Sequence, residues 1–261
     1  MGKIKYLMMF VNCFISQFIL SQQYEITYEV AYKATKSDTL KLKNFYVLKL
    51  DSEKRESIFT SLKYENSLNI TIYKNFNRNE FTSYESILNN NYSINYNFNY
   101  SAWKLENIQK DILGYSCRKA IISFGGRDWE AWYTNDISLQ DGPYKFYGLP
   151  GLILEIYSRD GDYKFTMKGL MKKNLTVSKP TAIPLNTIAK EKEFKLKIIS
   201  DPASQYRNQM LQLKSNNMGI SVSFNGKEIT QKETEQRIIN DFEKWRKEHD
   251  NPIEKDHIWI K

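Results

Sequence analysis

Alternating apolar and polar residues dominate the first two thirds of the chain. Over residues 24–32 a Tyr, Ile or Val occupies every second position, with Glu, Thr or Ala between them. The pattern returns over residues 40–50 with interleaved lysines, and apolar runs follow over 55–64 and 69–74. Because successive side chains of a strand point to opposite faces, each stretch predicts a strand with one buried face. Polar turns between the stretches favour a meander of antiparallel strands.

An aromatic ladder continues this pattern over residues 92–100. The side chains that share one face are Tyr92, Ile94, Tyr96, Phe98 and Tyr100. Such a row is typical of a core wall, because aromatic residues fit the half-buried surface of a strand. A stacking platform for sugars or bases would need the same row. We expect the core wall and keep the platform as the alternative.

A first hairpin is predicted at Gly125-Gly126, which separates apolar runs over residues 111–124 and 127–134. Two glycines form a favoured two-residue hairpin loop and fix the register of the strands that they join. On that register Lys119 lies opposite Trp132, on the more polar face, where it can cover the Trp132 ring. Cys117 lies opposite Thr134 on the same polar face.

A second hairpin is predicted at Asp160-Gly161, between residues 152–158 and 163–167. This dipeptide is another preferred two-residue turn, and it places Ile156 opposite Phe165. We expect the two segments to be neighbouring antiparallel strands of one sheet.

Between the hairpins, glycine and proline punctuate an aromatic segment at Gly142-Pro143 and again at Gly148-Leu149-Pro150-Gly151. Pro150 has a fixed φ and pushes Leu149 into an extended conformation, whereas each glycine tolerates a positive φ or a close backbone approach. One interpretation is a buried corner between two strands, which glycines inside an apolar pattern favour. The other is a ligand-contacting loop, with Trp132, Tyr147 and Leu149 as the binding side chains.

Helical spacing replaces alternation after Lys172. Asp201-Pro202 predicts the cap and first turn of one helix. Thr230 and Glu233 predict a capping box at the start of another helix, which should end before Pro252. The single apolar stripe of this last helix should pack on the sheet.

These patterns predict a mainly β protein of the α+β class, with a curved antiparallel sheet or open half-barrel and a helix packed on it. The β domain should span residues 22–172, and residues 173–261 should form a linker and a helical part on the same domain. Residues 1–21 have the basic start, apolar run and small polar boundary of a signal peptide. The run is too short and too interrupted for a transmembrane helix.

The charge of the chain is mildly basic. It has 38 Lys and Arg residues against 30 Asp and Glu, a net charge of +8, and loss of Lys3 and Lys5 with the signal peptide lowers this to +6. The basic residues are scattered singly, so solvated faces explain them better than a nucleic-acid groove does. Contact with an anionic envelope surface stays open.

Candidate catalytic groups are sparse. Cys13 lies in the predicted signal peptide, which leaves Cys117 as the one cysteine of the mature sequence and no partner for a disulfide within it. Basic neighbours could lower the pKa of Cys117, but a buried small hydrophobe explains it as well. His249 and His257 both lie in the polar C-terminal segment, at no spacing that indicates zinc or a base for Cys117. No metal and no cofactor is predicted.

The hexapeptide from Gly148 to Ile153 is accompanied by shorter motifs along the second half of the chain. These are Ile112-Leu113-Gly114-Tyr115, Cys117, Ala120, Gly126-Arg127, Ala131-Trp132-Tyr133-Thr134, Gly142-Pro143, Phe146 and Asn251-Pro252-Ile253-Glu254. Together they resemble the GLPGLI family of secreted bacterial envelope proteins, which is named for the hexapeptide. The resemblance implies secretion and a shared fold, with Cys117, Gly142, Pro143, Gly148, Pro150 and Gly151 as structural positions. It implies no particular reaction, and the tail from His257 to Lys261 extends beyond the family's usual asparagine-proline ending.

A secreted, periplasmic or outer-membrane-associated protein that binds without catalysing a reaction fits these observations best. The expected partner is an apolar ligand, a glycan or another envelope protein, held in an aromatic concavity or at a sheet edge. The alternative is a thiol-dependent or hydrolytic envelope enzyme that uses Cys117. No nucleic-acid partner is expected.

Overall fold

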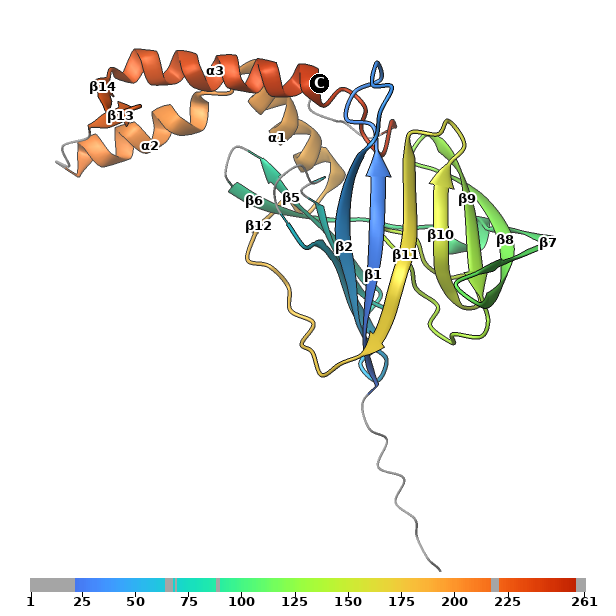
Figure 1. Cartoon of the computed structure of the whole chain (residues 1–261). Coiled ribbons are helices and arrows are strands. Elements are labelled where there is room, and N and C mark those ends of the chain that lie inside the picture. Colours follow the sequence, from blue (N-terminus) through green and yellow to red (C-terminus); the bar gives the residue numbers. More distant parts are fainter. Residues whose placement is uncertain (1–21, 64–67, 69, 88–89, 217–220, 257–261) are drawn as a thin grey trace, which may run out of the picture.

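The computed structural model describes residues 22–63, 68, 70–87, 90–216 and 221–256. The predicted signal peptide, residues 1–21, and the tail from His257 lie outside the described residues. Within them the protein is mainly β with helices in its C-terminal part, as the sequence predicts (Figure 1). No helix among these residues has both the length and the apolar character needed to cross a membrane.

One large sheet forms the body of the protein. Its strands are β1 Gln23–Tyr32, β2 Leu42–Asp51, β3 Glu56–Ser61, β4 Ile70–Asn75, β5 Glu80–Ile87, β6 Asn90–Asn95, β7 Lys104–Ile112, β8 Tyr115–Phe124, β9 Arg127–Thr134, β10 Leu152–Ser158, β11 Tyr163–Lys172 and β12 Ile183–Pro184. The helical part consists of α1 Ile188–Ser200, α2 Ser204–Ser215 and α3 Gln231–Glu248, with a small hairpin, β13 Val222–Phe224 and β14 Lys227–Ile229, between α2 and α3.

The large sheet is a single curved, unclosed layer with the strand order β12-β6-β5-β4-β3-β2-β1-β11-β10-β9-β8-β7. Strand β1 lies in its middle and pairs along its whole length with β2 on one side and with β11 on the other. The described pairings are antiparallel, except that the two-residue β12 runs parallel to β6. Because the sheet curves, β5 and β6 lie behind β1 and β2 in Figure 1. The predicted curved antiparallel sheet is therefore confirmed.

The registers of both predicted hairpins are also confirmed. In β8 and β9, Lys119 lies opposite Trp132, which leaves Gly125-Gly126 as the two-residue loop. In β10 and β11, Ile156 lies opposite Phe165. A shift of one residue would exchange the buried and exposed faces, so the alternation of residues fixes these pairs.

Several elements differ from the sequence-based expectation. The sequence patterns do not predict β5 or α1, and β6 ends five residues before Tyr100. The stretch 111–124 is interrupted by a tight turn at Leu113-Gly114, where both residues have positive φ, and it therefore belongs to two strands. Helix α2 begins at Ser204, because the carboxylate of Asp201 pairs with the guanidinium of Arg207 instead of capping the first turn.

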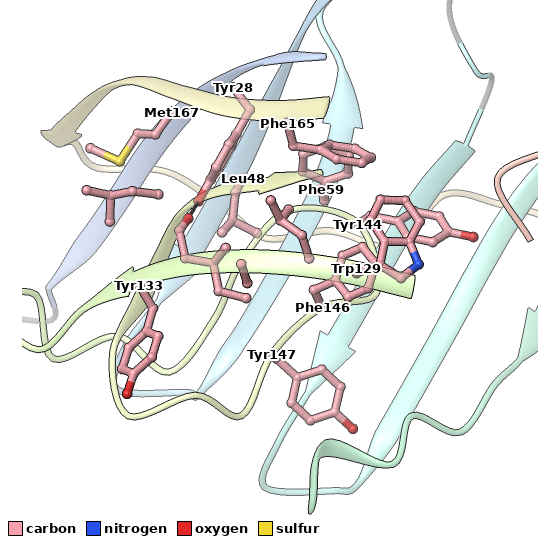
Figure 2. Close-up of a cluster of buried hydrophobic side chains, with 14 of the residues drawn as sticks. Tyr28, Leu48, Phe59, Trp129, Tyr133, Tyr144, Phe146, Tyr147, Phe165 and Met167 are labelled. Atoms are coloured by element: carbon pink, nitrogen blue, oxygen red, sulfur yellow. Dashed lines mark hydrogen bonds between the residues drawn. The ribbon is translucent and has the colours of Figure 1, made fainter. Parts of the chain in front are cut away.

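The loop that joins β9 to β10 fills the concave side of the sheet. This loop, residues 135–151, contributes Tyr144, Phe146, Tyr147 and Leu149 to the main core. Phe146 packs against the fully buried Trp129 with ring centroids 4.8 Å apart, and Tyr147 stacks on Phe81 at 4.9 Å. Figure 2 shows the loop rings among the aromatic side chains of the sheet. The open sheet thus obtains its core from its own loop.

A buried ion pair anchors this loop to the sheet. Lys74 on β4 has no exposed side-chain area, and its ammonium contacts the carboxylate of Asp141 and the carbonyl oxygens of Gly142 (2.8 Å) and Tyr144 (3.3 Å). Ser57 donates its hydroxyl to the other Asp141 oxygen at 2.5 Å. Burial lowers the pKa of Lys74, and the charge of Asp141 opposes this effect. Three acceptors therefore match the three donors of the ammonium.

The aromatic ladder serves as a core wall. Tyr96 and Phe98 belong to the main core, whereas Tyr92 and Ile94 join a second cluster with Ile198 of α1 and Phe242 of α3. Tyr100 is exposed. The second cluster attaches the helices to the sheet, as predicted for the C-terminal helix, whose Thr230–Glu233 capping box is present. Beyond it, α2 and α3 extend side by side away from the sheet (Figure 1).

We expect Lys74→Met to lower the free energy of unfolding by about 3–5 kcal/mol, because it leaves the Asp141 carboxylate buried without its counter-ion. Lys173→Met is the matched control: it removes the pair with Glu25, in which the Lys173 side chain is half exposed, and should cost no more than about 1 kcal/mol. Denaturant midpoints measure both. Equal midpoints for the two variants would contradict the anchoring role.

We expect Gly151→Val to cost about 2–6 kcal/mol of stability. Gly151 has φ +146°, and an added Cβ would lie 1.8 Å from the carbonyl oxygen of Thr134, so backbone strain and overpacking add together. Gly161→Val is the control, because Gly161 also has a positive φ, of +79°, but has open space around a Cβ. An equal loss of stability in both variants would contradict the claim that the close approach of Gly151 to Thr134 adds to the cost.

Candidate functional site

The residues predicted to bind a ligand at the loop are buried. Trp132, Tyr147 and Leu149 have exposed fractions of 7%, 5% and 1%. The indole nitrogen of Trp103 donates a hydrogen bond to the carbonyl oxygen of Tyr147 at 2.9 Å. Lys110, rather than the predicted Lys119, lies over the Trp132 ring, with its ammonium 4.1 Å from the centroid. These three side chains offer almost no surface to a ligand, and they support the corner between β9 and β10.

The glycines of the loop lie where the surrounding residues leave no room for a side chain. At Gly142, Gly148 and Gly151 an added Cβ would come within 3.0 Å of Ile153, Tyr100 and Thr134, respectively. Pro143 is buried and Pro150 is exposed. The corner interpretation of this segment therefore agrees with its packing.

A second set of motif residues meets at the other end of the loop. The guanidinium of Arg127 is fully buried and donates hydrogen bonds to the Asn251 side chain (2.7 Å) and to the carbonyl oxygens of Pro252 (2.7 Å) and Ile253 (3.0 Å). Asp160 and Asp162 balance its charge. The C-terminal motif Asn251–Glu254 is thereby fixed against the sheet, although it lies more than a hundred residues from Arg127 in the sequence.

This docking encloses a cavity of about 170 Å³. Its walls come from β4, β5 and β6, from the end of β8, from the loop, from α1 and from the C-terminal motif. The side chains with ionisable groups that line it are Glu85, Tyr96, Tyr144, Lys145, Glu191, Lys195 and Glu254. Ile94, Phe124 and Ile253 supply apolar surface, and Asn97 and Ile188 are exposed. A concave site with apolar walls and polar groups that converge on it is the usual form of a binding pocket.

The two ammonium groups of the cavity are already engaged. Lys195 Nζ lies 2.8 Å from Glu191 Oε1 and 3.0 Å from Glu85 Oε2. Burial lowers the pKa of Lys195, but the charges of Glu85 and Glu191 outweigh it and raise the pKa overall. Lys145 Nζ lies 2.5 Å from Glu254 Oε1, which also accepts the hydroxyl of Tyr144. The cavity therefore has three carboxylates against two paired ammonium groups.

Two buried polar atoms at this cavity have no hydrogen-bond partner among the described residues. They are the hydroxyl oxygen of Tyr96 and Oε2 of Glu191. Burial, with smaller effects from Tyr147, Asp141 and Glu254, raises the pKa of Tyr96 well above its usual value, so the hydroxyl keeps its proton and can donate. Leaving such atoms unpaired costs about 1–3 kcal/mol each. A ligand or water in the cavity would recover part of that cost.

Sequence patterns miss most of this site. Tyr96 appears in the predicted core wall and Glu254 in the C-terminal motif, but neither pattern indicates a cavity. The signal that could have been used is Glu191 four residues before Lys195, which places the pair on one face of a helix. Nothing in the sequence indicates that Glu85 and Lys145 join them.

The other polar groups of the described residues that could serve catalysis have structural contacts. Ser57, Lys74 and Asp141 are of types that hydrolases use, but all three are buried inside the core and serve as the loop anchor. His249 stacks on Trp245 with ring centroids 5.0 Å apart, and His257 lies outside the described residues. No group of His, Cys, Asp or Glu in the described part of the chain could hold a metal ion.

Cys117 is buried, which corrects the expectation that it lies on a wetter face. Its side chain belongs to the main core and has no exposed area. Burial raises the pKa of the thiol to about 11, so the nucleophilic thiolate is a minor species at neutral pH.

Comparison with known proteins gives one family match. The model of the family described as N-glycanase peptide, N-terminal domain, matches residues 26–191. Two crystal structures of PNGF-II, in different space groups, are similar, with a TM-score of 0.51 each and identities of 20% and 19%. Each match covers 66% of this chain but only 32% or 33% of PNGF-II, so the matched part spans about a third of that protein. At this identity the likeness shows the fold, and no curated protein matches the sequence.

We expect Cys117 to react with a thiol reagent at least about 100-fold more slowly in the native protein than in denaturant, because the thiol is buried and protonated. The measurement is labelling in a Cys13→Ser background. Ser116→Cys combined with Cys117→Ala is the control, because Ser116 is exposed on the same strand. If Cys117 were labelled as fast as the control cysteine, the thiol would be accessible, and this would favour the alternative of an enzyme that uses Cys117.

Proposed function

The chain belongs to the family of the N-glycanase peptide N-terminal domain, and from this premise we propose that it is a glycan-binding protein of the bacterial cell envelope. The charged cavity beside α1 is its binding site. The observation that carries the proposal is that the buried Tyr96 hydroxyl and Glu191 Oε2 face this cavity unpaired.

The composition of the cavity supports a sugar as the ligand. Sugar hydroxyls both donate and accept, so one sugar can pair with a carboxylate oxygen and with a phenolic hydroxyl at once. The apolar face of a sugar ring stacks on aromatic side chains, and Phe124 and Tyr144 line the cavity. An N-glycanase acts, by its name, on glycans, which agrees with this assignment.

The volume limits what enters the cavity. At about 170 Å³ it is close to the ~150 Å³ cavity that accepts benzene, a six-membered ring, and smaller than the ~300 Å³ at which most ligand pockets begin. One sugar unit of a larger glycan would therefore enter, while the rest of the glycan remains in solvent near Asn97 and Ile188.

We propose an extracytoplasmic location, in the periplasm or at the outer membrane. The signal-peptide pattern of residues 1–21 and the resemblance to GLPGLI envelope proteins support it. The alternative function, an enzyme that uses Cys117, has no support from the buried thiol. Binding at the cavity requires no nucleophile, and this favours recognition as the activity of the described residues.

We expect Tyr96→Phe to weaken binding of a released N-glycan by about 2- to 10-fold, the contribution of one hydrogen bond, without loss of thermal stability. Stability should hold or rise, because the variant removes a buried hydroxyl that has no partner among the described residues. Titration calorimetry and thermal melts measure the two effects.

Tyr100→Phe is the matched control, since Tyr100 lies four residues away, is exposed, and is not among the residues that line the cavity. It should bind as the wild type does. Wild-type affinity in both variants, or no glycan binding by the wild type at concentrations up to millimolar, would refute the proposed function.

A further inference from the structure

The charge of the cavity points to the kind of sugar that it accepts. Its formal charge is negative by one unit, from Glu85, Glu191 and Glu254 against Lys145 and Lys195. Both ammonium groups already contact carboxylates at 2.5–3.0 Å. An acidic ligand would therefore have to displace an existing ion pair, and the site would remain without a counter-ion for the displaced carboxylate.

The carboxylate oxygen of Glu191 that has no hydrogen-bond partner also favours a neutral or cationic ligand over an acidic one. Oε2 of Glu191 is an acceptor without a donor among the described residues, while Oε1 of the same carboxylate is bound to Lys195. The residue is 4% exposed, so little solvent screens its charge. A hydroxyl can supply the missing donor, and an ammonium supplies both a donor and the compensating charge.

We infer that the cavity selects its sugar by charge, accepting an amino sugar with a free amine best, a neutral sugar less well and an acidic sugar least. This inference rests on the proposed glycan-binding function and adds its chemical class. The amine pairs with Glu191, and the Tyr96 hydroxyl pairs with a ring substituent. Selection of this kind works partly by rejection, since a carboxylate on the ligand would meet unpaired negative charge.

The affinities of glucosamine, glucose and glucuronic acid at pH 6 test the inference, because these sugars share one ring and differ in charge. We expect about 10-fold or more between glucosamine and glucuronic acid, because the ligand changes from a cation to an anion beside the Glu191 carboxylate. Glu191→Gln should reduce this ratio to about 3-fold or less. Glu80→Gln is the control, because Glu80 lies on β5, outside the cavity lining, and the substitution changes the net charge of the protein equally.

A second variant guards against loss of folding in Glu191→Gln. Asn97 is exposed at the cavity, so Asn97→Asp adds a negative charge without disturbing the core, and it should increase the ratio of the glucosamine affinity to the glucuronic acid affinity.

Preference for glucuronic acid, or an equal response to Glu80→Gln and Glu191→Gln, would overturn the inference. If no single sugar binds at millimolar concentration but a released N-glycan does, the charge selection fails and the glycan-binding function stands. If neither binds, the proposed function fails with it.

Discussion

The buried pair between Lys74 and Asp141 is the interaction on which the rest of the structure depends. It joins β4, which lies between β3 and β5 in the sheet, to the loop of residues 135–151 that fills the concave side. Two charges without solvent contact are tolerated only when their remaining hydrogen-bonding capacity is used. Here Ser57 completes the carboxylate and two carbonyl oxygens complete the ammonium. The same carbonyls fix the backbone at Gly142 and Tyr144, from which the loop enters the core and the cavity.

This anchor explains how an unclosed sheet obtains a core. A single curved sheet leaves its concave face open unless another element covers it. In this protein residues 135–151 cover it, with Phe146 against Trp129 and Tyr147 against Phe81. The close approach of Gly151 to the Thr134 carbonyl lets the loop return directly into β10. The Gly148-Leu149-Pro150-Gly151 motif is therefore the turn that connects this core-filling loop to β10.

The parts of the fold that the sequence predicts are those fixed by local chemistry. Gly125-Gly126 and Asp160-Gly161 set the registers of two hairpins, and Thr230 with Glu233 begins α3. Predictions fail where the outcome depends on a side-chain contact or a turn that the alternation of residues does not reveal. Asp201 pairs with Arg207 instead of capping α2. Lys110, from β7, covers Trp132, because the turn at Leu113-Gly114 adds a strand that the pattern does not reveal.

The cavity lies beyond sequence reasoning for the same physical reason. Glu85, Lys145 and Glu191 come from a strand, a loop and a helix, and only the docking of Asn251–Glu254 by Arg127 closes the space around them.

The folding requirements that explain the other buried charges do not explain this site. Lys74 and Arg127 are surrounded by acceptors, so each is accounted for by the contact that it makes in stabilising the fold. Tyr96 and Glu191, by contrast, each leave an atom at the cavity without a partner among the described residues, at a cost of about 1–3 kcal/mol each. Tyr96 packs in the main core and Glu191 pairs with Lys195, and the atoms that these contacts leave without a partner are the ones that a ligand in the cavity would bind.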